Sequence, residues 1–527
     1  MMKLADISTQ VARRWPGEVE TRLDVSSSTC DLSCTSNALP AVCTWLFTEA
    51  GYSFAGLVAE EGASQWELRY LFYGERAMGW VQVIIYAPLS ERTFPSISAS
   101  VHAADWHERE VEDHFGLVFE GHPRLGDFVL HDDRWQEGLE PMRHRFNGRE
   151  AVGERQPNLH WRPRRIVHAP GSFMMPIGPV FSGGTEPVHF LLETVGEDVI
   201  RTIPRLFYAY RGIEKIAEGR TVADALLLAE RFCGTSAFAH GLAFCQAVET
   251  ISRLDVPPRA RALRVLLAEL ERFRHHVAAI EAICESTALA VAASQTAMLQ
   301  EDVLRVTGAL TGHRYLFGLL CVGGLTRDLS DTDCQDALAA VQHVGLQLDK
   351  IEQLLRFTSS FLDRIEQVGV TAHTDVRAYG LVGPVARAAG IARDLRKAQP
   401  YCGYEALNFE VPVENEGDGY ARLRILFAEA RQSVRLMEQA VASLPAGPVT
   451  VPPELQPGAA LGWTEAPRGA AVHWLRLGED GQVERYRIIP PSFMNWHGFH
   501  LAAEDFAFQD FPIILATFDL SVAENDR

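Results

Sequence analysis

The chain has 527 residues, too many for a single hydrophobic core, so two or three domains are expected. Its composition, 47% hydrophobic and 22% charged residues, is that of a soluble globular protein. The formal net charge of −19 lacks the basic surface that nucleic acid or anionic lipid headgroups require, which excludes both as direct partners.

The N-terminus has no apolar core of a signal peptide, and no stretch approaches the roughly 18 apolar residues of a membrane span. A cytoplasmic protein that meets a membrane only through partners is therefore expected. Nine scattered cysteines without an export signal indicate reduced thiols rather than disulfides. Cys30 and Cys34 would share one face of a helix, but two ligands alone make a poor metal site, so a structural role is favoured.

The first part of the chain mixes short helix and strand patterns. They comprise a helical period over 38–52, aromatic and β-branched strand segments over 66–74 and 80–89, and an acidic amphipathic helix over 106–116. Together they predict a small α+β domain over residues 1–145. Residues 146–170 are polar and contain proline without any period, which is typical of a linker.

Beyond the linker the pattern becomes helical. Residues 190–208 predict two strands around a Gly-Glu-Asp turn. Apolar positions at three- and four-residue spacing then predict helices over 221–253, 258–288, 295–311, 333–366 and 419–443. Residues 460–527 are predicted to return to short strands and loops. The expected fold class is α+β: a small N-terminal α/β domain, then a mainly helical bundle with a peripheral β-sheet over 171–527.

Most common site motifs are absent from the sequence. It has no phosphate-binding loop of the Walker type, no GxGxxG after a strand, no GxSxG and no HExxH. His275 and His276 lie in a charged helical pattern and are expected on a solvated face. Metal-site character is confined to residues 230–240, ERFCGTSAFAH, where Cys233 precedes a helix but Ser236 stands where a second thiolate would be needed.

Two sets of motifs resemble known subunits of respiratory complexes. Residues 106–124, WHEREVEDHFGLVFEGHPR, are similar to the signature of the 30-kDa subunit of complex I. From residue 176 the chain resembles the 49-kDa subunit of complex I and the large subunit of group 4 [NiFe] hydrogenases such as formate hydrogenlyase. The matching stretches are 176–200, 210–221, 230–249, 383–401, 465–474 and 491–521. The resemblance implies that both subunit types are fused in one chain.

Most nickel ligands of the family are missing. In the hydrogenases, four thiolates from an RxCGxxC and a DPCxxC motif hold nickel, an ion that soft sulfur suits. Here Arg231 and Cys233 match the first motif, but the other three ligand positions hold Ser236, Ser521 and Glu524. These departures argue against hydrogenase activity and imply that the chain holds no metal, with Cys233 left as a small, half-buried thiol.

The quinone site of complex I is altered in the same way. Where the 49-kDa subunit has a histidine and a tyrosine that donate to the quinone carbonyls, this chain has Phe181 and Phe244. A phenyl ring can stack on a quinone but cannot donate a hydrogen bond. Tyr208, Tyr210 and His240 remain as alternative donors.

Other matching positions keep their hydrogenase identity. Glu186 matches the proton-passing glutamate, and Arg468 matches the arginine that overhangs the metal centre. Arg231 flanks the Cys233 motif at 230–240, which is called the corner below. With His240 they either serve in an inherited cavity or hold the fold as paired buried groups. We expect Glu186 to contact Arg468 or Arg231, or to face a water-filled pocket near Cys233.

The resemblance also implies partners. Arg211, Glu214 and Lys215 would lie near the iron–sulfur cluster of a small partner subunit, and a salt-bridge cluster at a helix start is the alternative. Antiporter-like and other membrane subunits would hold the pair on the cytoplasmic face of the inner membrane, with quinone as a candidate acceptor. Two functions remain: coupling of electron transfer or conformational change to ion translocation, and a non-redox scaffold that regulates an ion-translocating complex.

Overall fold

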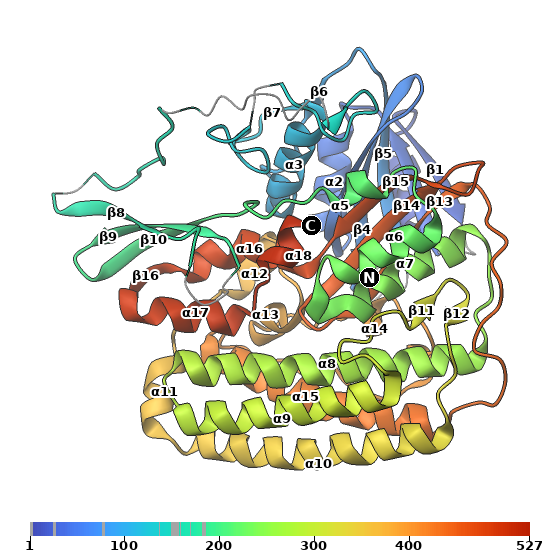
Figure 1. Cartoon of the computed structure of the whole chain (residues 1–527). Helices are drawn as coiled ribbons and strands as arrows, with labels where there is room; N and C mark the ends of the chain where they lie inside the picture. Colours follow the sequence, from blue (N-terminus) through green and yellow to red (C-terminus); the bar gives the residue numbers. More distant parts are fainter. Residues whose placement is uncertain are drawn as a thin grey trace.

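The computed structural model describes residues 4–24, 28–75, 79–135, 138–148, 158, 160–168, 170–181 and 186–527. Its first layer is a five-stranded sheet of order β1-β2-β5-β4-β3, in which only β2 and β5 are parallel (Figure 1). The strands are β1 (Val19–Asp24), β2 (Thr29–Cys34), β3 (Tyr52–Glu61), β4 (Gln65–Gly74) and β5 (Trp80–Pro88). The other elements of this layer are α1 (Leu4–Arg14), α2 (Leu39–Thr48), α3 (Asp105–Phe115) and the parallel pair β6 (Thr93–Pro95) and β7 (Val118–Glu120).

Local sequence explains α3, the helix of the 30-kDa signature. Asp105 and Glu108 lie in its first turn, where negative charge favours the positive end of the helix dipole. Gly116 ends the helix in a left-handed conformation with φ 67°, which glycine adopts without steric cost. The helix predicted over 106–116 is therefore confirmed within one residue at each end.

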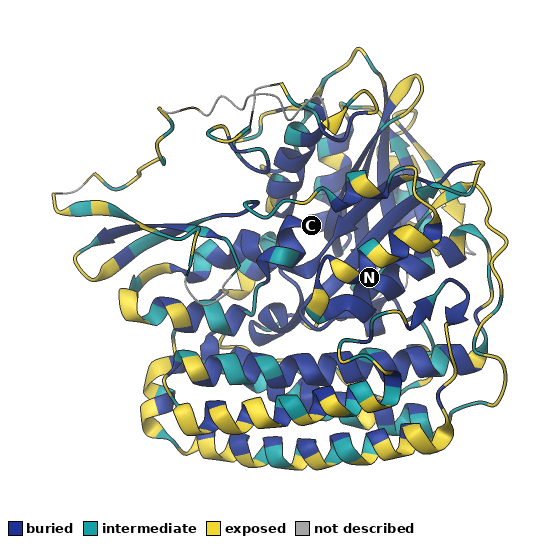
Figure 2. Cartoon of the chain, viewed as in Figure 1, coloured by how far each residue is buried: buried dark blue, intermediate teal, exposed yellow. Residues whose placement is uncertain are grey.

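A four-helix bundle forms the opposite layer of the molecule (Figure 1). Each of its helices packs against two others in a ring of order α8, α9, α10 and α15. Their bounds are α8 (Pro258–Ser286), α9 (Ala290–Thr311), α10 (Asp331–Arg356) and α15 (Gly419–Ala442). Figure 2 shows exposed outer faces on α9 and α10, whereas α8 is mostly buried. The predicted helical bundle is confirmed.

The elements between these layers come from distant parts of the chain. Their helices are α5 (Ile213–Ala217), α6 (Val222–Arg231), α7 (Ala237–Ile251), α11 (Ser359–Ile365), α12 (His373–Ala378), α13 (Gly383–Ala388), α14 (Leu395–Ala398), α16 (Pro491–Ala502), α17 (Phe511–Phe518) and α18 (Val522–Asp526). One antiparallel sheet contains β13 (Gly458–Ala466), β14 (Gly469–Leu477) and β15 (Val483–Ile489). A projecting sheet, order β16-β10-β9-β8, contains β8 (Ser172–Ile177), β9 (His189–Val195), β10 (Asp198–Arg205) and β16 (Glu504–Ala507) (Figure 1). The short strands β11 (Leu320–Cys321) and β12 (Gly324–Leu325) pair with each other.

Three local expectations were wrong. Residues 491–526 fold mainly as α16, α17 and α18 rather than as strands and loops, because their apolar side chains pack around the ends of the central sheet. His275 and His276 are buried, not solvated, because they lie on α8 and bond to Asp519 at 2.5 Å and to Glu429 at 3.0 Å. Cys30 and Cys34 lie on β2, not on a helix, and alternation along the strand turns both into the core.

The N-terminal layer shares its core with the C-terminal elements. One hydrophobic cluster joins side chains of β3–β5 and α3 to those of β14, α16 and α17. Ion pairs cross the same boundary, including Arg487 with Glu110 at 2.5 Å and Arg393 with Glu75 at 2.8 Å. Much of the linker predicted at 146–170 lies outside the described residues, so the domain boundary stays a prediction. Among the described residues, no helix is both long enough and apolar enough to cross a membrane.

Candidate functional site

Cys233 lies in a break between α6 and α7. The chain leaves the α-helix at Phe232, Cys233 adopts an extended backbone, and Gly234–Ser236 form a single 3-10 turn. The helix predicted over 221–253 is thus two helices with the corner motif between them. The Cys233 side chain is buried rather than half-buried, and burial raises the pKa of its thiol to about 11. In this environment the thiol is neutral at neutral pH.

The C-terminal segment carries Glu524 to this corner. After α17, Asp519 adopts a left-handed conformation, and Ser521 caps α18 by accepting the Glu524 N–H at 3.1 Å. The buried Glu524 carboxylate accepts from His240 Nε2 and from the Ser492 N–H, each at 3.1 Å. Burial opposes its ionisation, but the His240 hydrogen bond and the nearby Arg468 charge hold the pKa of Glu524 at about 2.

A line of buried hydrogen bonds continues from Glu524 into the central sheet. His240 Nδ1 lies 3.0 Å from His473 Nε2, and His473 Nδ1 lies 2.8 Å from the Tyr486 hydroxyl. Burial lowers the pKa of His473 well below its usual value, so this ring is neutral. An ionised Glu524 can only accept, so His240 Nε2 donates to it, and the line links four buried side chains from Glu524 to Tyr486.

Arg468 reaches the corner from the hairpin between β13 and β14. Its guanidinium donates to Thr235 Oγ1 at 3.0 Å and to Asp519 Oδ1 at 3.4 Å, and it also bonds the Asp519 carbonyl. Thr235 Oγ1 lies 3.4 Å from Cys233 Sγ, so Arg468 and Cys233 share a neighbour. The hairpin is held close to α13 because Gly383 has no side chain: a Cβ there would lie 2.0 Å from the Arg468 carbonyl oxygen.

Glu186 joins the same region but does not bind an arginine. Its carboxylate accepts from the Val522 N–H at 2.5 Å, the Ala523 N–H at 3.1 Å and the Ser521 hydroxyl at 3.3 Å. These N–H groups have no intrahelical partner because they begin α18. Of the two alternatives expected for Glu186, a direct contact with Arg468 or Arg231 is not found among the described residues, since helix-end donors satisfy Glu186 and Asp519 pairs with Arg468. The alternative, a water-filled pocket, stays a prediction.

The remaining basic and acidic candidate residues lie in different surroundings. Arg231 is exposed, with its guanidinium 5.8 Å from the Phe317 ring. Arg211 lies at the corner, where its guanidinium donates to the carbonyls of Phe232 and Ala523. It thereby links the end of α6 to α18. The other two enter ion pairs: Glu214 with Arg527 at 3.0 Å and with Arg487 at 3.3 Å, and Lys215 with Glu218 at 2.6 Å.

The two phenylalanines are not brought together. Phe244, on α7, is fully buried in the hydrophobic cluster that contains the helical bundle. Its ring packs edge to face on Tyr486, with 5.4 Å between the ring centroids. Phe181 packs against the other cluster, which contains the N-terminal sheet. The alternative donors are also engaged: Tyr210 bonds His114 at 3.1 Å, and Tyr208 lies 3.3 Å from both Arg205 and His189.

The residues at the corner do not fit a four-thiolate nickel centre. Cys233 is the one thiol among the four ligand positions, Ser521 caps a helix, and Glu524 is committed to His240 and Ser492. Hard oxygen donors replace the soft sulfur that such a centre needs. No step of a hydrogenase reaction can be built on this donor set.

Sequence reasoning missed His473 and Tyr486. A signal for them exists, because GEDG at 478–481 marks a hairpin turn between two strand-like segments. The register of that hairpin pairs His473 with Ile488 and Leu475 with Tyr486, which puts both polar residues on one face. Their contact with His240 was not predictable, since it joins residues 233 positions apart.

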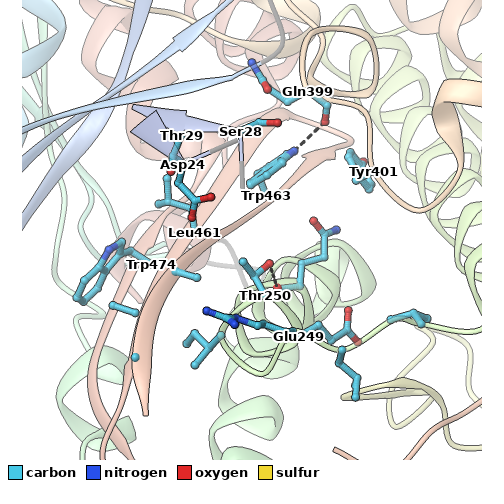
Figure 3. A pocket seen from close by; sticks show the side chains of 18 of the residues that line it. Asp24, Ser28, Thr29, Glu249, Thr250, Gln399, Tyr401, Leu461, Trp463 and Trp474 are labelled. Carbon is cyan, nitrogen blue, oxygen red and sulfur yellow. Dashed lines mark hydrogen bonds between the residues drawn. The ribbon is translucent and has the colours of Figure 1, made fainter. Parts of the chain in front are cut away.

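A separate hollow of about 1040 Å³ lies between the β1–β2 edge, the end of α7 and β13. Figure 3 shows the indole of Trp463 directed at the Gln399 carbonyl, which it bonds at 2.8 Å, with Tyr401 beside it. Side chains of both charge signs line the hollow, among them Asp24, Glu249 and Arg264. None of the corner residues contributes to it, so it is distinct from the Cys233 site.

Comparisons with known proteins agree with the two sequence resemblances. The family "Respiratory-chain NADH dehydrogenase, 30 Kd subunit" matches residues 32–152, and its 49 Kd counterpart matches residues 290–456 and 452–527. The family "Nickel-dependent hydrogenase" matches residues 211–282, which contain the Cys233 corner. The predicted order of a 30-kDa part followed by a 49-kDa part is thereby confirmed.

Individual relatives span between two thirds and nearly all of the chain. Formate hydrogenlyase subunit 5 of Escherichia coli is 30% identical over 504 residues, covering 93% of this chain and 88% of the relative. The carbon monoxide-induced hydrogenase of Rhodospirillum rubrum is 32% identical over 370 residues, 68% and 99% of the two chains. The C/D subunit of NADH-quinone oxidoreductase from Bdellovibrio bacteriovorus is 29% identical over 462 residues, 80% and 81%. The chain therefore belongs to the family of complex I 30-kDa/49-kDa-type and hydrogenase-type subunits, with both parts fused.

Proposed function

We propose that this chain is the core subunit of a membrane-associated complex of the complex I and hydrogenase class, and that it works without a [NiFe] centre of its own. The names of its relatives support a place in a larger assembly: formate hydrogenlyase subunit 5, hydrogenase-4 component G and the C/D subunit of NADH-quinone oxidoreductase. Its role is to couple electron transfer or conformational change in that complex to ion translocation.

One observation carries this proposal. Two of the positions at which the family holds nickel have side chains that bind other groups of this chain: Glu524 bonds His240, and Ser521 bonds the α18 backbone. From there His473 and Tyr486 extend the contacts into the β14–β15 hairpin. A rearrangement at the corner would therefore be transmitted to the β14–β15 hairpin. A coupling subunit without its own redox centre requires such a connection.

The proposed partners follow from the same family. An iron–sulfur small subunit would pack beside the corner, where Arg211 bridges the Phe232 and Ala523 carbonyls. Glu214 and Lys215 are ion-paired within this chain and would support that surface rather than touch a cluster. Antiporter-like membrane subunits would hold the complex on the cytoplasmic face of the inner membrane.

A non-redox scaffold is the second candidate, favoured by the surroundings of Phe181 and Phe244. Phe244 is fully buried against Tyr486, and the Tyr486 hydroxyl is already bonded to His473. The alternative donors Tyr208, Tyr210 and His240 are likewise engaged within the protein. Quinone reduction at this place thus lacks a free hydrogen-bond donor among the residues proposed for it.

Composition and metal content of the native complex test the main proposal. The complex would be isolated through an affinity tag on this chain from nickel-supplied cells. We expect iron–sulfur and membrane subunits by mass spectrometry, iron by elemental analysis, and no stoichiometric nickel. One nickel per chain, or isolation without any membrane subunit, would overturn the proposal.

Tyr486→Phe separates coupling from scaffolding. The variant removes one hydroxyl from the buried line and keeps the ring beside Phe244, and Tyr86→Phe on the exposed side of β5 is the matched control. For a coupling subunit, the Tyr486→Phe complex assembles normally but drives less ion uptake into proteoliposomes. Unchanged ion uptake in an intact complex would favour the scaffold.

A further inference from the structure

The Cys233 corner contains a set of metal-binding atoms different from that of the family. Cys233, His240 and Glu524 each offer one such atom, and these atoms all lie within 4.8 Å of one another. All three residues are buried, with exposed fractions of 2%, 0% and 0%. Among the described residues, no other group of three or more His, Cys, Asp or Glu side chains comes together in this way.

Ser236 provides a second, independent observation. It stands at the N-cap position of α7, yet its hydroxyl caps nothing, because the Glu271 carboxylate accepts the Phe238 and Ala239 N–H groups at 2.8 and 2.9 Å. The Ser236 side chain is fully buried, and its Oγ has no hydrogen-bond partner. Burying a hydroxyl without a partner is unfavourable, so a ligand that used this oxygen would stabilise the site.

The backbone places Ser236 close to Cys233 in the chain. The two residues are at the ends of one 3-10 turn, and the Ser236 N–H donates to the Cys233 carbonyl oxygen at 3.3 Å. One cysteine, one histidine, one glutamate and one hydroxyl make four donors.

We propose that Cys233, His240 and Glu524, with Ser236 as the fourth donor, bind a single zinc-like divalent transition-metal ion. Cysteine sulfur, histidine nitrogen and glutamate oxygen are the three ligand types of Zn²⁺, which takes four of them in a tetrahedron. Metal–ligand lengths of about 2.0–2.3 Å give tetrahedral edges of about 3.3–3.6 Å. His240 Nε2 and Glu524 Oε1 are 3.1 Å apart, close to such an edge.

Outer contacts already orient these ligands. His240 Nδ1 bonds His473, and Glu524 accepts the Ser492 N–H at 3.1 Å, as metal-bound histidines and carboxylates commonly do. With the ion on Nε2, the neutral His240 ring would carry its proton on Nδ1, which would donate to His473 Nε2, so the His240–His473 bond is retained. A thiolate, a carboxylate and a divalent ion also sum to zero charge, which suits a buried site.

This site is not the nickel centre of the family, since three of its four donors differ and are harder. It goes beyond the proposed function and does not depend on it. The two fail separately: nickel at full occupancy overturns the proposed function, whereas a complex without any metal bound through Cys233 overturns only this inference.

Cobalt and zinc are the probes for the test. The complex, isolated through a tag on this chain from zinc-supplied cells, would be compared as wild type, Cys233→Ser and Cys245→Ser. Cys245 is the matched control, because it is equally buried on α7 but belongs to no donor cluster among the described residues. We expect one fewer zinc per chain in Cys233→Ser and no loss in Cys245→Ser. Cobalt exchange should give a thiolate-to-cobalt absorption band in wild type that Cys233→Ser abolishes.

Two further variants probe the geometry. Ser236→Cys should tighten Co²⁺ binding and intensify the thiolate band, because a second sulfur would join the site. His473→Phe, which removes an outer contact of His240, should weaken binding by about 10- to 100-fold. If Cys233→Ser fails to assemble, zinc X-ray absorption of the wild-type complex decides instead, with one sulfur among nitrogen and oxygen scatterers expected. Equal zinc in wild type and Cys233→Ser, or a zinc shell without sulfur, would overturn the proposal.

Discussion

Glu186 shows how a half-buried charge in this protein is balanced by backbone rather than by a cation. Its carboxylate accepts two N–H groups and one hydroxyl at the start of α18. Partial removal from water would otherwise make an unpaired carboxylate costly. The same region pairs Arg468 with Asp519, so each charge has its own partner.

Glu186→Gln should lower stability. The amide keeps the shape of the side chain but loses the charge that strengthens its hydrogen bonds, and bonds to charged groups are worth about 1.5–3 kcal/mol. We expect a comparable loss in free energy of unfolding and less assembled complex. Thermal unfolding is the measurement, with exposed Glu197→Gln as control. Unchanged stability with loss of ion movement would instead assign Glu186 to coupling.

Glu108 on α3 makes stability depend on pH. Burial raises the pKa of its carboxyl to about 8, against 4.5 when unfolded, although the Ile97 N–H and Ser96 hydroxyl oppose the shift. Between these values the folded state binds more protons, so stability is lost as pH rises from about 4.5 to about 8. Each pKa unit corresponds to about 1.4 kcal/mol, so the loss approaches about 5 kcal/mol.

Glu108→Gln should remove this dependence. The neutral amide mimics the protonated acid, so the variant should match wild type near pH 4.5 and be more stable near pH 8. Denaturant unfolding at the two pH values is the measurement, and exposed Glu120→Gln is the control. A variant that is less stable than wild type at pH 8 would show that the ionised carboxylate is the stabilising form.

Close backbone approach between elements sets the position of the β13–β14 hairpin. Gly383 begins α13 with φ +68°, and a Cβ there would lie 2.0 Å from the Arg468 carbonyl oxygen. Gly462 plays the same part on β13, where a Cβ would lie 1.9 Å from the Ala243 carbonyl oxygen of α7. The hairpin can therefore carry Arg468 to the corner only while both positions remain glycine.

Gly383→Ala should be strongly destabilising. The left-handed conformation alone costs about 1–2 kcal/mol for an alanine, and overpacking against backbone adds about 1–3 kcal/mol. Gly121→Ala is the matched control, because Gly121 also has positive φ, +85°, but no atom within 4 Å of a Cβ. The difference between the two free energies of unfolding measures the clash. Equal losses would mean that the hairpin shifts freely.

Across the whole molecule, buried ion pairs join the N-terminal layer to the rest. Glu110 on α3 pairs with Arg487 of β15 and with Arg527, and Glu214 binds both arginines. The four side chains are buried, so none of their charges is screened by water. The two parts matched by different families thus share one ionic cluster and one hydrophobic core.

Arg487→Met should weaken that junction. Removing one partner of a buried pair typically costs about 3–5 kcal/mol, because the remaining carboxylates lose compensation. Arg305→Met is the control, since Arg305 forms an exposed pair with Glu301 that is worth about 0.5 kcal/mol or less. Denaturant unfolding of the full chain measures both. A loss below about 1 kcal/mol for Arg487→Met would show that the N-terminal layer is held by apolar contacts alone.

Much of the fold followed from the sequence because its causes are local. Apolar spacing predicted α8, α9, α10 and α15, and aromatic and β-branched segments predicted β4 and β5 of the first sheet. The resemblance to the hydrogenase motifs likewise assigned Ser236, Ser521 and Glu524 to thiolate positions, and that assignment stays a prediction.

Only the tertiary structure decided what replaced those thiolates. Glu524 bonds His240, which lies 284 residues away in the sequence. Arg468 pairs with Asp519, whereas Glu186 accepts hydrogen bonds from the α18 backbone. Periodicity says which face of a helix is buried but not which distant partner satisfies a buried charge. That choice depends on where several chain segments converge and on which donors remain free there. The burial of His275 has the same origin, because α8 is polar in sequence but enclosed by its neighbours.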